Sequence, residues 1–216
     1  MSDIHSNPRA TPEEEDFRFK YESGVIGQKL IDGYFRAVRK LSGEVLRDTP
    51  GQIRAVELGC GEGFSTARLR KLLPARVGLE ASEYVSRQVP EAKKRNPGMR
   101  IIQEDVYGLK RPTDRLDLVY LLEVMEHLDY PDRALAELKR TIKPGGFLIV
   151  GVPREPLWRF LNVARGKYLR HWGNTTGHLN HWSSKAFIRQ IEAGFGTVRK
   201  VQTPLPWTIV LAQKDR

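Results

Sequence analysis

Short apolar runs alternate along most of the chain with stretches in which apolar residues recur every three or four positions. The runs predict strands, and they fall at residues 53–58, 76–80, 99–103, 116–122 and 147–152. The stretches with helical spacing fall at residues 24–47, 65–73, 82–95 and 131–142. Strands that alternate with helices form parallel β-α-β units, so the pattern predicts an α/β fold with helices on both faces of a sheet.

The last third of the chain departs from this alternation. Helical spacing at 155–164 and 183–193 flanks a long polar and aromatic loop at 165–182, and strands at 197–202 and 207–213 are joined by only four residues. So short a joint favours an antiparallel pair. We therefore predict a doubly wound, Rossmann-like, seven-stranded and mostly parallel sheet with an antiparallel C-terminal strand. Residues 1–50 are expected to form a disordered leader and a helical lid, and residues 51–216 one domain with a basic, aromatic insertion at about 154–182.

Composition narrows the class of protein without naming a function. The 216 residues are 40% hydrophobic and 9% aromatic, which is ordinary for a globular domain and excludes a disordered, collagen-like or coiled-coil chain. No apolar run approaches the roughly 18 residues of a membrane-spanning helix, and the polar first twenty residues lack a secretion signal. We expect a cytoplasmic protein, at most peripheral at a membrane, in which the single Cys60 forms no internal disulfide.

The net charge of +10 is unevenly distributed. Residues 154–200 carry nine Lys or Arg against two Glu, with three Trp and three His among them. Such a segment suits an acidic acceptor, an anionic membrane surface or RNA. A solvated basic face with no specific partner explains the same charge equally well.

A glycine-rich segment, VELGCGEG at residues 56–63, follows the first strand and opens the first helix. In that position a loop presents backbone amides to a ligand. Its glycines at 59, 61 and 63 give GxGxG instead of the GxGxxG of dinucleotide-binding loops, because Phe64 occupies the place of the third glycine. The loop therefore favours a cofactor other than a dinucleotide, although glycines also form turns with no ligand.

Two acidic residues stand where the next two predicted strands end. Glu80 lies nineteen residues past Gly61 and can accept both hydroxyls of a ribose. Asp105, in QEDV, can accept a hydrogen bond from an adenine amino group. Alternatively, Glu80 is a solvated strand end and Asp105 caps a turn.

These ordered motifs resemble the class I S-adenosylmethionine-dependent methyltransferases over roughly residues 53–153. VELGCGEG resembles the first motif of the family, VGLEAS its ribose-binding acidic strand, QEDV its adenine-contacting loop and LKRTIKPGGFLIVGVP its helix-turn-strand signature. The resemblance implies S-adenosylmethionine as cofactor. It assigns the contacts to Glu57, Gly59, Cys60, Gly61, Gly63, Glu80, Ala81, Asp105, Val106 and Leu122.

Directly after the fourth strand, Glu123, Glu126 and His127 stand at positions i, i+3 and i+4. On a helix these side chains would share one face and could bind a divalent cation, with the two carboxylates favouring Mg²⁺ or Mn²⁺. Alternatively, the three are catalytic without a metal, His127 acting as general base for a hydroxyl acceptor. A purely structural role for all three, at a helix start, is the third possibility.

A second cluster, GHLNHWS at residues 177–183, adds His178, His181 and Trp182. Together with the Glu-x-x-Glu-His segment it resembles two metal-assisted subfamilies, the O-methyltransferases of ubiquinone biosynthesis and the 2′-O-methyltransferases of small RNAs. The RNA-type pattern implies His178 as fourth metal ligand, and the quinone-type pattern points to His181. The predicted acceptor-site residues are Trp158, Trp172, His178, His181 and Trp182; the His and Trp side chains could instead anchor a packed loop.

The sequence thus predicts a methyltransferase that uses S-adenosylmethionine to methylate an oxygen of a small or lipid-like metabolite. Metal-dependent 2′-O-methylation of RNA is the first alternative, because the basic charge and the same Glu and His pattern suit it. A non-catalytic S-adenosylmethionine-binding protein is the second.

Overall fold

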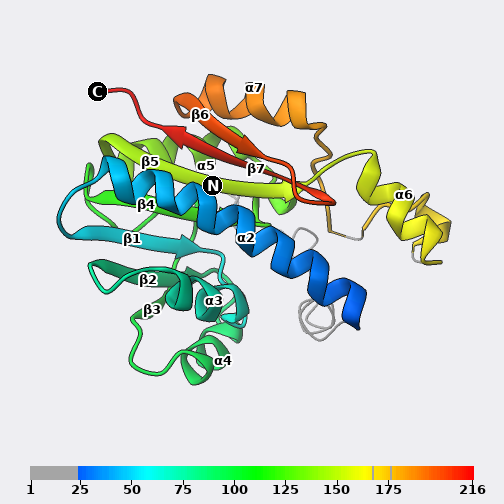
Figure 1. Cartoon of the computed structure of the whole chain (residues 1–216), viewed down its shortest axis with the longest axis horizontal. Helices are drawn as coiled ribbons and strands as arrows, with labels where there is room; N and C mark the ends of the chain where they lie inside the picture. Colours follow the sequence, from blue (N-terminus) through cyan, green and yellow to red (C-terminus); the bar gives the residue numbers. More distant parts are fainter. Residues whose placement is uncertain (1–23, 167, 176) are drawn as a thin grey trace, which may run out of the picture.

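The computed structural model describes residues 24–166, 168–175 and 177–216 and contains one seven-stranded sheet with the strand order β3-β2-β1-β4-β5-β7-β6 (Figure 1). The strands are β1 (Ile53–Leu58), β2 (Val77–Glu83), β3 (Ile101–Gln103), β4 (Leu116–Leu122), β5 (Ile142–Pro153), β6 (Thr197–Gln202) and β7 (Trp207–Gln213). β1 to β5 pair in parallel, whereas β7 is antiparallel to both β5 and β6. The predicted α/β fold class and its antiparallel C-terminal strand are confirmed.

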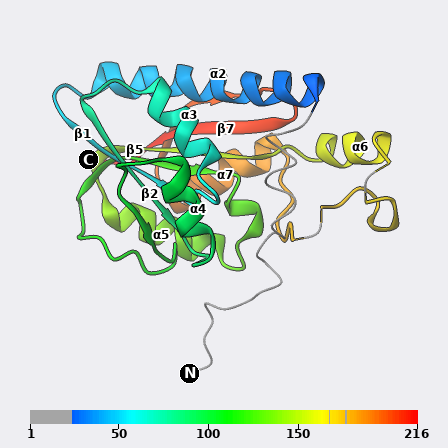
Figure 2. The ribbon, with the colours of Figure 1, turned by 90° about the horizontal axis from the view of Figure 1, so that it is seen from below.

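Helices cover both faces of the sheet (Figure 2). They are α2 (Val25–Asp48), α3 (Phe64–Leu72), α4 (Gln88–Arg95), α5 (Pro131–Thr141), α6 (Leu157–Ala164) and α7 (Ser184–Gly194), with 3-10 turns η1 (Met125–His127) and η2 (Leu169–His171). Apolar side chains of α2 and α3 pack on one face, and those of α5 and α7 on the other. None of these helices has the length and apolar character that crossing a membrane requires.

Helix α2 belongs to the core of the domain and is not a separate lid. Its apolar positions recur at helical spacing, so one face buries Tyr34, Val38 and Leu41 against β-strand residues such as Tyr120. The Ser42 hydroxyl also lies 2.8 Å from the Tyr120 hydroxyl in the interior. The predicted boundary at residue 50 therefore cuts through one core, and the leader and the earlier part of the predicted lid lie outside the described residues.

The bounds of three strands differ from the prediction, and β3 starts at Ile101, two residues later than predicted. β2 continues through Ala81 to Ser82 and Glu83, the first two residues of the predicted helix 82–95, because these residues pair with β1 and β3. The KPGG segment at 143–146, predicted as a turn, lies within β5, which starts at Ile142 and accommodates a register shift against β4.

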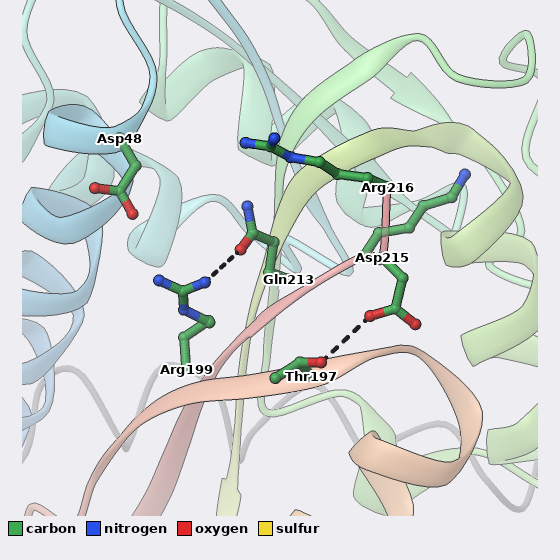
Figure 3. A pocket seen from close by; sticks show the side chains of 7 residues that line it. Asp48, Thr197, Arg199, Gln213, Asp215 and Arg216 are labelled. Atoms are coloured by element: carbon green, nitrogen blue, oxygen red, sulfur yellow. Dashed lines mark hydrogen bonds between the residues drawn. The ribbon is translucent and has the colours of Figure 1, made fainter.

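The carboxyl ends of β1, β2, β3, β4 and β5 meet at one edge of the sheet, as parallel pairing requires. The glycine loop, Asp105 and the Glu-x-x-Glu-His segment follow three of these ends, whereas Glu57 and Glu80 lie within β1 and β2. A polar cavity of about 540 Å³ is found at the opposite edge, where Thr197 opens β6 and Gln213 closes β7 (Figure 3). Arg199 donates to Gln213 and Thr197 to Asp215 within its wall, and no predicted site residue lines it.

Candidate functional site

The glycine loop turns sharply because its three glycines have left-handed backbone angles, with φ of +73° at Gly59, +54° at Gly61 and +80° at Gly63. Two of them also lack room for a side chain. A Cβ on Gly59 would lie 2.5 Å from a methyl group of Val124, and one on Gly63 would lie 2.5 Å from the side-chain nitrogen of Asn96. The contact with Val124 places the glycine loop directly against the segment that carries Glu123, Glu126 and His127.

Glu83, which the sequence analysis did not select, is the acidic residue at the end of β2 beside the glycine loop. Its carboxylate accepts a hydrogen bond from the Gly61 amide at 2.7 Å and another from the Val85 amide at 2.8 Å. The side chain is buried, and burial raises the pKa of Glu83 above its ordinary value. Each carboxylate oxygen has a second lone pair, so Glu83 can accept further hydrogen bonds from a ligand that lies over the loop.

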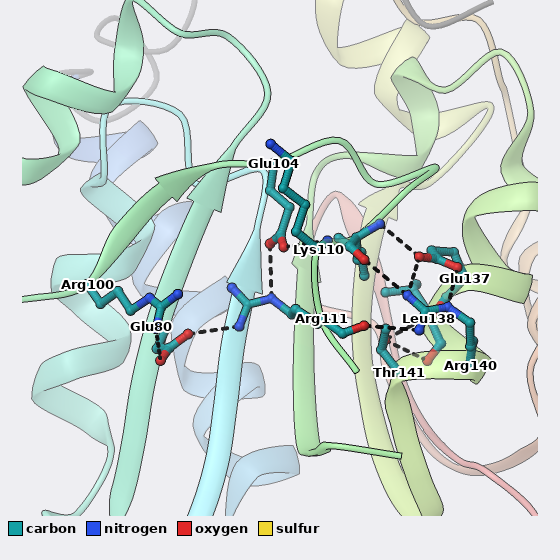
Figure 4. Close-up of polar contacts among 10 residues, drawn as sticks. Glu80, Arg100, Glu104, Lys110, Arg111, Glu137, Leu138, Arg140 and Thr141 are labelled. Atoms are coloured by element: carbon teal, nitrogen blue, oxygen red, sulfur yellow. Dashed lines mark hydrogen bonds and ion pairs between the residues drawn. The ribbon is translucent and has the colours of Figure 1, made fainter. Parts of the chain in front are cut away.

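The prediction that Glu80 ends β2 is wrong, because Glu80 pairs with Val56 in mid-strand. Its carboxylate instead bonds Arg111 at 2.8 Å and lies 3.8 Å from Arg100 (Figure 4). Arg111 also donates to the fully buried carboxylate of Glu104 at 3.0 Å. Glu80 is therefore part of an ion-pair network that joins β2 to the segment after β3.

The other residues assigned to the cofactor take different positions. Asp105 is partly buried two residues beyond β3, and its carboxylate accepts the Tyr107 amide at 2.9 Å. Ala81 and Leu122 are buried in the core, and Val106 packs against it. Cys60 is buried too, and burial with the nearby carboxylates raises the pKa of its thiol, so this cysteine is an unreactive packing residue.

Glu57, at the penultimate position of β1, is a buried carboxylate directly below the glycine loop. One of its oxygens accepts the Thr66 hydroxyl at 2.5 Å, and the other has no hydrogen-bond partner among the residues that the structure describes. Burial raises the pKa of Glu57 to about 7, because the charged form loses its hydration while only hydroxyl groups compensate it. A cationic ligand group at this point would favour the ionised carboxylate.

We expect the free energy of unfolding of the ligand-free protein to fall as pH rises from about 4.5 to about 7. Folding raises the pKa of Glu57 from 4.5 to about 7, so the folded state binds the proton more tightly and loses this advantage across that window. A shift of this size corresponds to about 3 kcal/mol at most. Urea unfolding at pH 5, 6, 7 and 8 measures it. Glu57→Gln should reduce the dependence to the part that the raised pKa of Glu83 contributes, and Glu192→Gln, on the exposed face of α7, should leave it unchanged; equal slopes in both variants would contradict the assignment.

Three further side chains meet where β4 ends. Candidate ligand atoms of Glu126, His127 and His178 all lie within 4.8 Å of one another. The His127 Nε2 atom lies 4.0 Å from the buried Glu126 carboxylate, and its Nδ1 atom lies 2.9 Å from the Gly177 carbonyl. Backbone amides of Leu179 and Asn180 donate to the Glu126 carbonyl, which holds the segment 177–181 on η1.

Glu123 does not join this group. The segment is a 3-10 turn that starts at Met125, and Glu123 precedes it with φ of +60°, so the i, i+3, i+4 geometry of an α-helix is absent. The Glu123 carboxylate instead accepts a hydrogen bond from the indole of Trp207, the first residue of β7, at 2.8 Å. The prediction that Glu123 shares one helical face with Glu126 and His127 is therefore wrong.

The predicted acceptor-site residues separate into two sets. Trp158 stacks on His178 with ring centroids 6.1 Å apart. The His181 ring centroid lies 6.4 Å from that of His178, and the His181 Nδ1 atom lies 3.5 Å from the Glu155 carboxylate. Trp182 instead packs on Phe187 in the core beneath α7, and Trp172 lies at the tip of the segment after α6 with 80% of its surface exposed. Neither of these two lies within the cluster around His178.

Comparisons with known proteins show which families and folds this chain resembles. Residues 56–150 match the family model described as a methyltransferase domain. Trans-aconitate 2-methyltransferase of Azoarcus sp. (strain BH72) is 35% identical over 65% of this chain and 55% of its own length. The mitochondrial ubiquinone biosynthesis O-methyltransferase of Candida albicans is 26% identical over 58% of this chain and 40% of its own length.

A solved SAM-dependent methyltransferase from Aquifex aeolicus shares the fold with a TM-score of 0.70, at 16% identity, over 94% of this chain and 99% of that one. The chain spans about half the length of the curated relatives that it matches. The matched residues include the glycine loop, Glu83 and the segment after β4. Residues 56–150 thus resemble a methyltransferase domain, and the chain has the fold of a solved SAM-dependent methyltransferase.

Proposed function

We propose that the protein transfers the methyl group of S-adenosylmethionine to a hydroxyl oxygen of a small, planar acceptor, which includes the head of a lipid-like molecule. The observation that carries the proposal is the group of Glu126, His127 and His178 at the end of β4. It lies next to the glycine loop, because Gly59 contacts Val124. A sulfonium methyl is already electrophilic, so the protein needs only to align the acceptor and help its hydroxyl lose a proton.

The cofactor contacts follow from the chemistry of the carboxyl edge. We assign the two ribose hydroxyls of the cofactor to Glu83 and its adenine amino group to Asp105. The α-ammonium group of its methionine part is assigned to a position beside the Glu57 carboxylate. The ammonium group supplies the positive charge that favours ionised Glu57, whose pKa burial raises to about 7. The close packing of Gly59 and Gly63 supports a ligand that lies flat on the loop.

The donor set beside the loop fits a divalent transition-metal ion. With metal–ligand bonds of about 2.1 Å, two ligand atoms lie at most about 4.2 Å apart. The donor atoms of Glu126, His127 and His178 lie within 4.8 Å of one another, so they would need to approach by only a fraction of an ångström. Two imidazoles and one carboxylate suit Mn²⁺ or a later ion better than Mg²⁺, which prefers oxygen ligands. When bound, such an ion lowers the pKa of a coordinated hydroxyl. A free general base, in contrast, would require only one imidazole and leave the other two donors without a role.

The surrounding residues orient this donor set. If the Nδ1–H of His127 donates to the Gly177 carbonyl, the Nε2 atom, 4.0 Å from the Glu126 carboxylate, carries a lone pair. That lone pair is available to a metal ion beside the carboxylate. Trp158 donates to the Thr175 hydroxyl at 2.8 Å, which fixes the indole that covers His178. Trp158, His178 and His181 therefore supply one wall of the acceptor site.

Planar hydroxyl compounds suit this wall better than polycarboxylates. The Trp158 ring offers a flat apolar surface, while the carboxylates of Glu123, Glu126 and Glu155 would repel an acceptor with several negative charges. The likeness to a ubiquinone biosynthesis O-methyltransferase supports the same acceptor class.

Transfer of a labelled methyl group tests the proposal. We expect the purified protein with Mn²⁺ and labelled S-adenosylmethionine to methylate a dihydroxyaryl compound at an oxygen, and to leave trans-aconitate and RNA unlabelled. Trp158→Ala should lower turnover about tenfold through loss of the stacking surface, with cofactor binding unchanged. Label only in trans-aconitate would overturn the acceptor class, and label at a ribose 2′-oxygen would establish the RNA alternative.

A further inference from the structure

We propose that the segment formed by α6, η2 and their connection, residues 157–173, docks on an anionic lipid surface. We call this segment the docking arm. The proposal goes beyond the proposed function, since it concerns the exposed side chains of the arm and not Trp158, which stacks on His178. Figures 1 and 2 both show the arm projecting from the body of the domain beyond the end of β5.

The docking arm exposes large apolar side chains at high density. Phe160 is 69% exposed, Leu169 60% and Trp172 80%, and Val163 is 43% exposed between them. These four are among ten exposed large hydrophobic residues in the described part of the chain, and they fall within thirteen positions. Isolated exposed hydrophobic residues are ordinary, whereas a contiguous group on a projection indicates a contact surface.

The apolar side chains remain outward because polar groups fill the inner side of the arm. The Asn162 amide, on α6, donates to the Gly173 carbonyl at 2.9 Å and to the Thr175 hydroxyl at 3.2 Å. The Trp158 indole donates to the same hydroxyl from the previous turn and packs toward the core. These hydrogen bonds join α6 to the residues at the end of the arm. The exposed face of the arm therefore keeps its conformation when no partner is bound.

The charge of the arm matches an anionic surface. Arg165 and Arg170 are exposed and Arg159 is partly exposed, while the nearest acidic residue along the chain, Glu155, is partly buried and lies 3.5 Å from His181. The sequence adds Lys167 to the same segment. Arg side chains around Trp and Phe are the composition that places a helix in the interface of a negatively charged bilayer.

The side chains exposed on the docking arm suit a lipid surface better than nucleic acid. Arg and Trp would serve either partner, because aromatic rings also stack on bases. The aliphatic Val163 and Leu169 gain free energy only when an apolar phase removes them from water, and phosphate or ribose does not provide one. The arm also follows the strand that ends beside the acceptor site, so a docked arm would bring that site close to lipid-like acceptors.

Co-sedimentation of the full chain with vesicles tests the proposal without any acceptor or methyl transfer. We expect the protein to pellet with vesicles of phosphatidylcholine containing phosphatidylglycerol, and not with phosphatidylcholine alone, at about 0.1 M salt. Trp172→Ala and Phe160→Ser should each weaken partitioning by about tenfold, the loss expected when one large side chain no longer enters the apolar phase. Arg170→Glu should weaken it further than Lys139→Glu, the same charge change on an exposed position of α5.

Binding of S-adenosylhomocysteine and the thermal midpoint confirm that each variant is folded. Failure of the folded wild type to pellet, or equal pelleting of all variants, would overturn the proposal. Stronger binding to RNA than to anionic vesicles, unaffected by Phe160→Ser, would also overturn it and would identify nucleic acid as the partner.

Discussion

Glu83→Gln should weaken the binding of S-adenosylhomocysteine by about 100-fold, because two hydrogen bonds between a carboxylate and ribose hydroxyls contribute roughly 1.5 kcal/mol each. The amide keeps the shape of the side chain and one acceptor oxygen for the Gly61 amide, which Glu83 binds at 2.7 Å. Calorimetry with the demethylated product measures the loss without any turnover.

Glu80→Gln provides the matched control, because it makes the same chemical change three residues earlier on the same strand. Glu80 lies in mid-strand and is paired with Arg111 and Arg100, so its replacement should change affinity less than twofold while lowering stability modestly. If Glu80→Gln abolished binding and Glu83→Gln did not, the ribose assignment would be wrong and the resemblance of VGLEAS to the family motif would hold in its original register.

The position of Glu83 illustrates which parts of the fold the sequence could predict. β1, β4, β6 and β7 were predicted at their observed bounds because turn-forming residues or abrupt polarity changes flank them. β2 carries no such signal at its end: Ala81 and Ser82 are small, and serine is a common helix N-cap. Only the pairing of Ser82 with β1 and β3, a long-range contact, extends the strand to Glu83. A sequence argument could have found Glu83 only by asking which acid lies last before the next helix.

The group of Glu126, His127 and His178 was also only partly predictable, because long-range contacts bring these residues together. The spacing of Glu123, Glu126 and His127 predicts a shared face only on an α-helix, whereas the chain forms a 3-10 turn that excludes Glu123. The approach of His178 to His127, with ring centroids 4.9 Å apart, joins residues 51 positions apart. No local pattern specifies that contact, and the resemblance to metal-assisted subfamilies was the one signal for it. The separation of Trp172 from Trp158 likewise depends on how Trp172 and Gly173 turn back to accept hydrogen bonds from Arg159 and Asn162 of α6.

The other large effect concerns the Glu126, His127 and His178 group. Treatment with a chelator should abolish methyl transfer, and Mn²⁺ should restore it in the wild type. His178→Ala should weaken Mn²⁺ binding by at least about 100-fold, since even residues that merely orient a ligand change metal affinity 10- to 100-fold. His181→Ala is the matched control, because it removes a neighbouring imidazole, 6.4 Å away between ring centroids, that is paired with Glu155 and belongs to no three-donor group.

Mn²⁺ titration followed by calorimetry, with no acceptor present, separates this question from the identity of the substrate. A wild-type protein with Mn²⁺ at 100 times its dissociation constant should gain about 2.7 kcal/mol in stability, and His178→Ala should gain almost none at that concentration. Full turnover in chelator, together with no heat of Mn²⁺ binding, would reject the cation. The proton of the acceptor would then have to pass to the His127 imidazole, whose Nε2 atom lies 4.0 Å from the Glu126 carboxylate. In that case we expect His127→Gln to abolish turnover, and added metal to have no effect.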